Sequence, residues 1–146
     1  MIEEPVRATE RLLPWVVSTH IKDGGVLMNH DGLTTFPVPV GEGIVDLGTI
    51  VAMLDTLPGP GHLSVEDHAG SFLLPVHDAA FLERFPDLAG AEFADLVQLA
   101  EVAAGRAGCR PGERSLWPST CEARRAHDLD ALRRLAARAP GVPGGG

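Results

Sequence analysis

The sequence lacks a long hydrophobic run, and this absence excludes several classes of protein. Its most apolar stretch, residues 43–54, is broken by Asp46, whereas a membrane-spanning helix needs about 20 consecutive apolar residues. The first ten residues, MIEEPVRATE, are acidic and contain no apolar core, so we expect no signal peptide. These features predict a protein that is neither inserted in a membrane nor secreted.

Cysteine is also scarce. The chain has two cysteines, Cys109 and Cys121, and no CxxC motif. Two cysteines cannot build a disulfide-rich framework, so we expect the reducing environment of the cytoplasm. The sequence has no GxSxG, GxxxxGK[ST] or HExxH motif either, and the Gly-Glu-Gly of residues 41–43 is too short for a phosphate-binding fingerprint.

Positive charge is in the minority and unevenly distributed. The 146 residues carry 12 basic and 20 acidic side chains, a net charge of −8, which argues against nucleic-acid binding. Residues 106–146 alone hold eight arginines against four acids. This arginine-rich end is either a phosphate-binding patch or, as is more usual, the solvated face of an amphipathic helix. Apolar residues make up 45% of the chain, enough for the core of one globular domain.

Hydrophobic periodicity predicts alternating helices and strands in the first half of the chain and helices in the second. A strand–helix–strand order predicts a parallel pair with a right-handed crossover. The expected elements are a helix over 5–13, a strand over 15–21, a loop of about a dozen residues after Gly25, a helix capped by Asp46, a strand over 62–66, helices over 78–85, 91–104 and 120–139 (the last capped by Ser119), and a disordered tail over 140–146.

Polar side chains collect where the two predicted strands end. Because the carboxyl ends of parallel strands meet at one edge of a sheet, and side chains alternate along a strand, we expect His20 and Lys22 to share a face, as do Glu66 and His68. Imidazole and carboxylate together supply half of a site for Zn, Mn, Co or Fe, and Glu66 is also a candidate general base. The simpler alternative is that His20 is a structural group.

The predicted loop contains a further pair of polar residues, His30 and Asp31. They are either a second metal ligand and a lid contact or, more simply, part of an ordinary Asn-His-Asp-Gly turn. The sequence alone favours the turn.

Three blocks of sequence, taken in order, resemble a known family. Residues 4–23 end in His-Ile-Lys-Asp, residues 38–46 read VPVGEGIVD, and residues 63–68 read LSVEDH. They are similar to the carboxyl-terminal part of the xylose-isomerase-like TIM barrels, the sugar phosphate isomerase/epimerase superfamily. The resemblance implies an α/β fold: a partial (β/α)8 TIM barrel, comprising its last strands and helices, over residues 1–75, with a helical C-terminal extension over 76–139.

The family resemblance also implies an isomerase activity, a metal-assisted proton transfer next to the carbonyl of a sugar or polyol. By position, His20 and Glu66 correspond to metal ligands, and Glu66 is also the catalytic acid/base. Lys22, Asp23 and His68 are the expected substrate-binding residues. The implied cofactor is a divalent metal (Mn, Zn, Co, Mg or Fe). The expected partner is a small-molecule sugar or polyol substrate, with no nucleic acid and no membrane, in a cytoplasmic protein that is a possible homo-oligomer.

Other interpretations stay open. The family's remaining ligands, a Glu and an Asp on earlier strands, would lie upstream of Met1, so this chain alone is expected to be incomplete. One alternative is an inactive, truncated barrel or an interaction module with an open sheet edge. Others are a related metal-dependent dehydratase or decarboxylase, or an assembly in which several chains complete one barrel.

Overall fold

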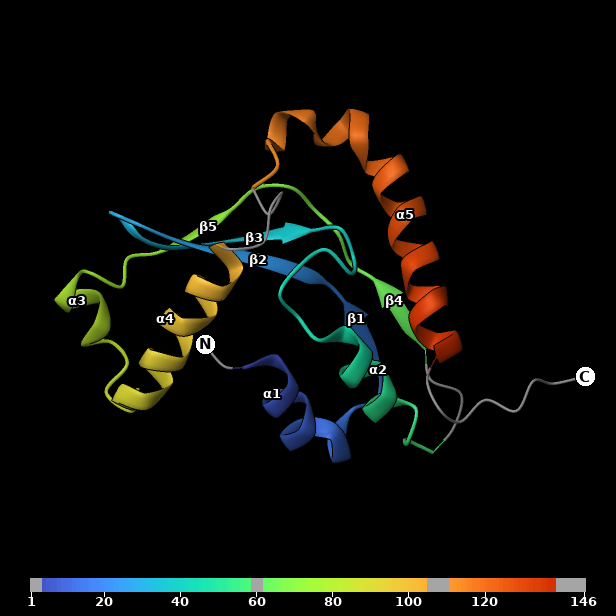
Figure 1. Ribbon diagram of the computed structural model, residues 1–146, viewed down its shortest axis with the longest axis horizontal. Helices are drawn as coiled ribbons and strands as arrows, with labels where there is room; N and C mark the ends of the chain where they lie inside the picture. Colours follow the sequence, from blue (N-terminus) through green and yellow to red (C-terminus); the bar gives the residue numbers. More distant parts are fainter. Residues whose placement is uncertain (1–3, 59–61, 105–110, 139–146) are drawn as a thin grey trace, which may run out of the picture.

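The structure is a computed structural model and describes residues 4–58, 62–104 and 111–138. The described chain forms two small sheets surrounded by helices (Figure 1). Strands β1 (Thr19–Ile21) and β4 (Leu63–Val65) form a parallel pair, and strands β2 (Asp23–Asn29), β3 (Gly32–Val38) and β5 (Phe72–Leu74) form an antiparallel sheet in the order β2-β3-β5. Lys22 alone separates β1 from β2, so one continuous segment takes part in both sheets.

The predicted strand–helix–strand order of the first half is confirmed, but its first strand is shorter than the predicted 15–21. Strand β1 begins at Thr19, and a short 3₁₀ turn, η1 (Leu13–Trp15), follows the first helix. Helix α2 (Leu47–Leu54) lies between β1 and β4 in the chain, and the two strands pair in parallel with His20 opposite Ser64. The side chain of Asp46 accepts a hydrogen bond from the backbone N–H of Thr49 at 3.0 Å, which is the expected N-cap geometry. Helix α1 (Pro5–Leu12) precedes the unit, with Glu4 as its N-cap.

The loop predicted after Gly25 is wrong: this segment is the β2–β3 hairpin. Its register pairs Asp23 with Val38 and Asn29 with Gly32. The glycines that suggested the end of a strand lie inside β2, where they weaken local strand propensity. Burial against distant residues outweighs that propensity, since Leu33 is completely buried in a cluster completed by later parts of the chain.

The helices of the second half lie close to their predicted positions. They are α3 (Ala79–Leu82), α4 (Gly90–Ala104) and α5 (Trp117–Arg138), the last preceded by a short 3₁₀ turn, η2 (Arg114–Leu116). The predicted cap at Ser119 is wrong, because Ser119 lies inside α5 and its hydroxyl donates to the carbonyl of Leu116 at 2.8 Å. Pro118 suits the first turn of a helix, where its missing N–H costs nothing. The predicted tail over 140–146 lies outside the described residues.

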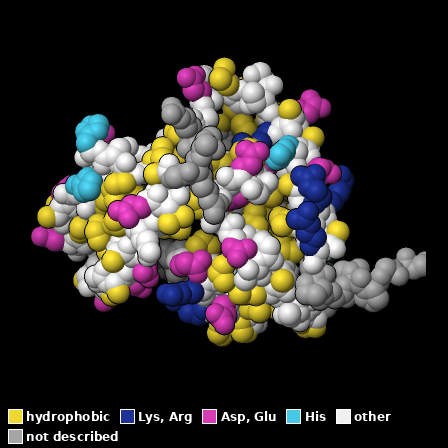
Figure 2. Space-filling view, viewed as in Figure 1, with side chains coloured by type: hydrophobic (Ala, Val, Ile, Leu, Met, Phe, Trp, Pro, Cys, Tyr) yellow, Lys and Arg dark blue, Asp and Glu magenta, His cyan; other side chains and the backbone are white. Residues whose placement is uncertain are grey.

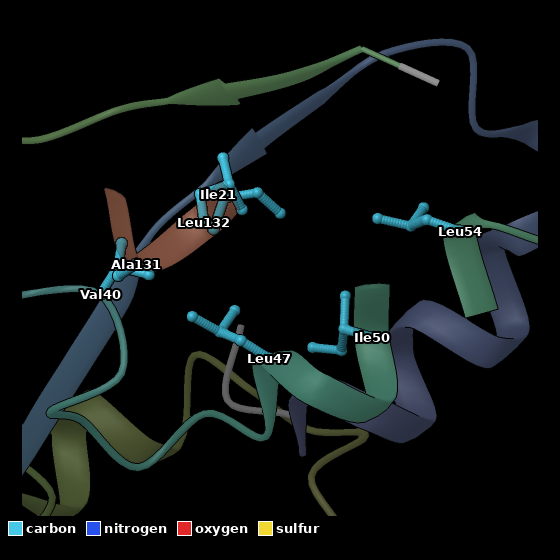
Figure 3. Packing of buried hydrophobic residues seen from close by; sticks show 7 residues of the cluster. All are labelled: Ile21, Val40, Leu47, Ile50, Leu54, Ala131 and Leu132. Carbon is cyan, nitrogen blue, oxygen red and sulfur yellow. The ribbon is translucent and has the colours of Figure 1, made fainter. Parts of the chain in front are cut away.

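The first of two main hydrophobic clusters joins the parallel pair to helices from both halves of the chain. Ile21 from β1 packs with side chains of α2 and with Leu132 of α5 (Figure 3). Helix α5 therefore covers the same core as α2. The buried members of this cluster are Ile21, Val40, Leu47, Ile50, Leu54, Ala131 and Leu132.

The second cluster joins the antiparallel sheet to α4. Val26 of β2 and Leu33 of β3 pack against Leu96 and Ala100 of that helix. Helices from residues 76–139 thus complete both clusters, and the proposed boundary at residue 75 stays a prediction. Among the described residues neither sheet closes into a barrel, so the partial TIM barrel also stays a prediction. The same residues contain no helix long and apolar enough to cross a membrane.

Candidate functional site

Four polar side chains meet where β1 and β4 end. Nδ1 of His20 lies 3.2 Å from Oε2 of Glu66, and Nζ of Lys22 lies 3.5 Å from Oε1 of the same carboxylate. Nζ of Lys22 also lies 2.6 Å from Nε2 of His68. These contacts confirm the predicted placement of both pairs at one sheet edge; their chemical roles stay predictions. We call His20, Lys22, Glu66 and His68 the strand-end cluster.

The parallel register creates this cluster. Backbone N–H of Glu66 donates to the carbonyl of Ile21 at 3.1 Å, which extends the ladder to the strand ends and aligns the two groups. The cluster is open to solvent, with the Glu66 side chain 50% exposed. The hydrogen bond from His20 and the nearby Lys22 ammonium lower the pKa of Glu66. Glu66 is therefore an ionised carboxylate at neutral pH, able to accept a proton or bind a cation.

Asp23 occupies a different environment from the cluster. Its side chain is buried, 1% exposed, and both carboxylate oxygens accept hydrogen bonds from backbone N–H groups in and around the Gly-Glu-Gly turn and from Gly24. Oδ2 accepts from Gly41 and Gly43 at 2.9 Å each, and Oδ1 accepts from Gly24 at 2.8 Å and from Val45 at 3.3 Å. A Cβ at Gly43 would overlap this carboxylate. Asp23 organises the turn, and its predicted contact with substrate stays untested.

A buried charge cluster lies behind the strand end, and sequence reasoning missed it. Nε of Arg124 lies 3.1 Å from Oδ2 of Asp67 and 3.1 Å from Oδ2 of Asp128. Oδ1 of Asp128 accepts from the backbone N–H of Val40 at 2.8 Å. Two signals were available: strand alternation turns Asp67 away from Glu66, and Arg124 and Asp128 have i,i+4 spacing.

The Asp67 carboxyl makes stability pH-dependent. Burial, with a hydrogen bond to Asp128, raises its pKa from 3.8 to about 6. Because the folded state holds this proton more tightly than the unfolded state, the associated stability is present below about pH 4 and is lost as the pH rises to about 6. In the Asp67→Asn variant we expect this pH-dependent decrease in the free energy of unfolding, on the order of 1 kcal/mol, to disappear. Urea unfolding at pH 4.5 and pH 7 measures the free energy of unfolding at the two pH values.

The exposed Asp87 provides the matched control for that experiment. Asp87→Asn should leave the difference in unfolding free energy between the two pH values as it is in the wild type. An Asp67→Asn variant that kept the wild-type difference would contradict a proton-binding role for Asp67.

The other polar candidates of the sequence are separated from the strand-end cluster. His30 and Asp31 form the two-residue turn of the β2–β3 hairpin, as the simpler interpretation predicted, and Nε2 of His30 lies 3.2 Å from Oδ1 of Asp31. Basic side chains gather over α5 (Figure 2). Among them Arg134 pairs with Asp130 on the same helix, as on the solvated face of an amphipathic helix.

Two donors of the strand-end cluster fit a divalent metal. Ligand atoms about 2.0–2.2 Å from one ion lie roughly 3 Å apart when they are neighbours around it, and Nδ1 of His20 and Oε2 of Glu66 are separated by 3.2 Å. In residues 4–58, 62–104 and 111–138, no group of three or more His, Cys, Asp or Glu residues is arranged to hold a metal ion. His20 and Glu66 as metal ligands therefore stay a prediction.

A cavity of about 830 Å³ opens beside the strand-end cluster. Lys22 and His68 belong to its wall, together with Arg114 of η2 and apolar side chains of the antiparallel sheet and of α4. No local sequence pattern pointed to Arg114 as a neighbour of this cluster, because the residue is distant in the chain from both strand ends. The cavity provides room for a small molecule next to Lys22 and His68, whereas His20 and Glu66 lie outside its lining.

Comparison of the chain with models of protein families, with curated proteins and with solved structures found no match. A functional proposal for this chain therefore rests on two observations, the geometry of the site and the resemblance of the three sequence blocks.

Proposed function

We propose that the strand-end cluster catalyses proton transfer next to the carbonyl of a small sugar or polyol-derived substrate, in the manner of a sugar isomerase or epimerase. The observation that carries this proposal is the Glu66 carboxylate held between His20 at 3.2 Å and Lys22 at 3.5 Å. It combines a proton acceptor with a cation beside a cavity. The three sequence blocks resembling xylose-isomerase-like barrels support the same reaction class. A dehydratase or decarboxylase would use the same enediolate chemistry.

Each residue has a distinct part in the proposed reaction. Glu66 removes the proton from the hydroxyl-bearing carbon next to the carbonyl and returns it to the former carbonyl carbon, while the hydroxyl proton moves to the former carbonyl oxygen; in an epimerisation the proton returns to the same carbon from its other face. A carboxylate with a lowered pKa is a weak base, so the negative charge that develops on the substrate oxygen needs stabilisation. The Lys22 ammonium supplies it as a hydrogen-bond donor, and His20 orients Glu66. His68 contacts Lys22 at 2.6 Å and holds the ammonium at the cavity wall.

Deuterium exchange tests the reaction class. Small aldoses and ketoses incubated with the protein in D2O should incorporate deuterium at the carbon next to the carbonyl, as detected by NMR. If no member of the panel incorporates deuterium above the rate without protein, with or without added divalent metal, the proposal is wrong.

A divalent metal (Mn, Zn, Co, Mg or Fe) is the proposed cofactor, with His20 and Glu66 as two of its ligands. When bound, it supplies Lewis-acid polarisation of the substrate carbonyl. We expect His20→Ala to weaken binding of Mn or Zn by at least about tenfold, because the loss of a ligand costs at least as much as the loss of a group that orients one. Isothermal titration calorimetry with the metal alone measures this effect.

His62, exposed just before β4, supplies the control for metal binding. His62→Ala should bind the metal with wild-type affinity, whereas Glu66→Gln should weaken binding as His20→Ala does. Equal affinities for the wild type and both site variants would remove the metal from the strand-end cluster.

A second candidate function, a non-catalytic interaction module, is favoured by the exposed apolar side chains before β1. Trp15 is 73% exposed and Val17 is 97% exposed, next to a two-stranded sheet with open edges, and such edges invite association. This role requires a concentration-dependent mass in light scattering and no deuterium exchange. For either function we retain the cytoplasm as the proposed location.

A further inference from the structure

The cavity beside the strand-end cluster has an apolar wall that a sugar would not need. Most of its lining side chains have no hydrogen-bonding group, and they come from β2, β3, the β5 region and α4. Phe72 is 65% exposed at this wall. A polyol in such a cavity would leave most of its hydroxyl groups without protein partners, which is unfavourable. The apolar lining side chains include Val26, Phe36, Ile44, Phe72, Leu96 and Leu99.

Six of the side chains that line the cavity are polar, and two of these are cations. Lys22 lines it at the strand end, and Arg114 lines it where η2 begins. The side chain of Arg114 is exposed and forms no ion pair within the described part of the chain, while its Cδ lies 3.8 Å from where a Cβ on Gly70 would stand. Lys22 already pairs with the Glu66 carboxylate at 3.5 Å, and the Asp23 carboxylate lies beside it in the cavity wall. Arg114 is therefore the lining cation whose charge no carboxylate of the described residues pairs with.

We propose that this cavity binds a small organic acid with an apolar or aromatic body. The guanidinium of Arg114 pairs with the ligand's carboxylate, the apolar wall covers the body, and the carbonyl end lies toward Lys22 and His68. This inference rests on the reaction proposed for the strand-end cluster, proton transfer next to a carbonyl, and it replaces the sugar or polyol of that proposal by an apolar oxo acid. Two cations and an apolar wall are the chemistry that recognises such a molecule.

The test uses 3-phenylpropionate as an unreactive probe in isothermal titration calorimetry with the full chain. Three comparison probes separate its parts: 3-phenylpropanol lacks the charge, acetate lacks the aromatic body, and xylitol represents a polyol. We expect 3-phenylpropionate to bind at least about tenfold more tightly than each of them, since the charged pair and the buried ring each contribute at least that factor.

Two variants assign the binding to the cavity. Arg114→Gln should weaken binding of 3-phenylpropionate by at least about tenfold and leave binding of 3-phenylpropanol unchanged. Arg133→Gln removes the same charge from an exposed position of α5 that does not line the cavity, and it should bind like the wild type. Phe72→Ala should weaken both aromatic probes without affecting acetate.

The outcomes separate this inference from the proposed function. Tighter binding of xylitol than of 3-phenylpropionate, equal binding to Arg114→Gln and the wild type, or no measurable binding of the probe overturns the inference, and a sugar isomerase would then still be tested by deuterium exchange. Binding as expected, without deuterium exchange into any oxo acid or sugar, keeps the acid-binding cavity and overturns the proposed catalysis.

Discussion

Replacing Glu66 by glutamine is expected to lower the rate of substrate deuterium exchange by a factor of about 10² to 10⁴, the usual contribution of a general acid–base group. The amide has nearly the same shape as the carboxylate but cannot accept the proton. Because the Glu66 side chain is half-exposed and belongs to neither main hydrophobic cluster, the variant should fold like the wild type. The loss is therefore expected in the rate of exchange, measured by NMR, with an unchanged unfolding midpoint.

Glu42 offers the matched control for this substitution. It is an exposed glutamate 3.6 Å from His127, outside the strand-end cluster, and Glu42→Gln should exchange deuterium at the wild-type rate. A Glu66→Gln variant with the wild-type rate would remove Glu66 from the mechanism. Equal losses in both variants would point to an effect of charge alone.

Replacing Asp23 by alanine is expected to lower the free energy of unfolding by about 3–5 kcal/mol. The substitution removes the acceptor of four backbone N–H groups, one of them buried and three partly buried. Each hydrogen bond to a charged acceptor contributes about 1.5–3 kcal/mol, with incomplete additivity. Typical domains have only about 5–15 kcal/mol of stability. Urea unfolding monitored by the fluorescence of Trp15 and Trp117 measures this loss.

Asp23→Asn keeps the shape of the side chain and one acceptor oxygen, so it should lower the free energy of unfolding by less than Asp23→Ala does. Asp31→Ala, at the exposed hairpin turn, should change the free energy of unfolding by no more than about 0.5 kcal/mol. If Asp23→Ala remained within about 1 kcal/mol of the wild type, the turn would have another source of stability, and Asp23 would be available for the substrate contact predicted from the sequence.

The strand-end cluster could be predicted because it depends on two short-range rules. Side-chain alternation places His20 and Lys22 together, and parallel pairing aligns them with Glu66. The same rules separate Asp23 from Lys22, but the family resemblance grouped both with the substrate. The structure assigns Asp23 to the Gly-Glu-Gly turn through backbone N–H groups 18–22 residues away, a contact that requires the folded arrangement of β2 and this turn.

The β2–β3 hairpin and the role of α5 could not be read from local patterns. Gly24 and Gly25 suggested a loop. Strand β2 forms instead because its apolar side chains are buried against helix α4. Similarly, the arginines of α5 suggested a solvated helix. One of them, Arg124, turns inward to Asp67, because Leu132 of the same helix packs on the core formed by β1 and α2.

The amino-acid sequence by itself determined the helices, the parallel strand pair and the meeting of four polar side chains at one sheet edge, because caps, periodicity and alternation act over a few residues. Only the tertiary structure decided which charges are buried and where a cavity opens. Val40 and Asp128 are 88 residues apart in the chain, and Arg114 shares a wall with Lys22. Residues so distant in the chain become neighbours because whole surfaces are buried against one another in the folded protein. No local sequence pattern contains that information.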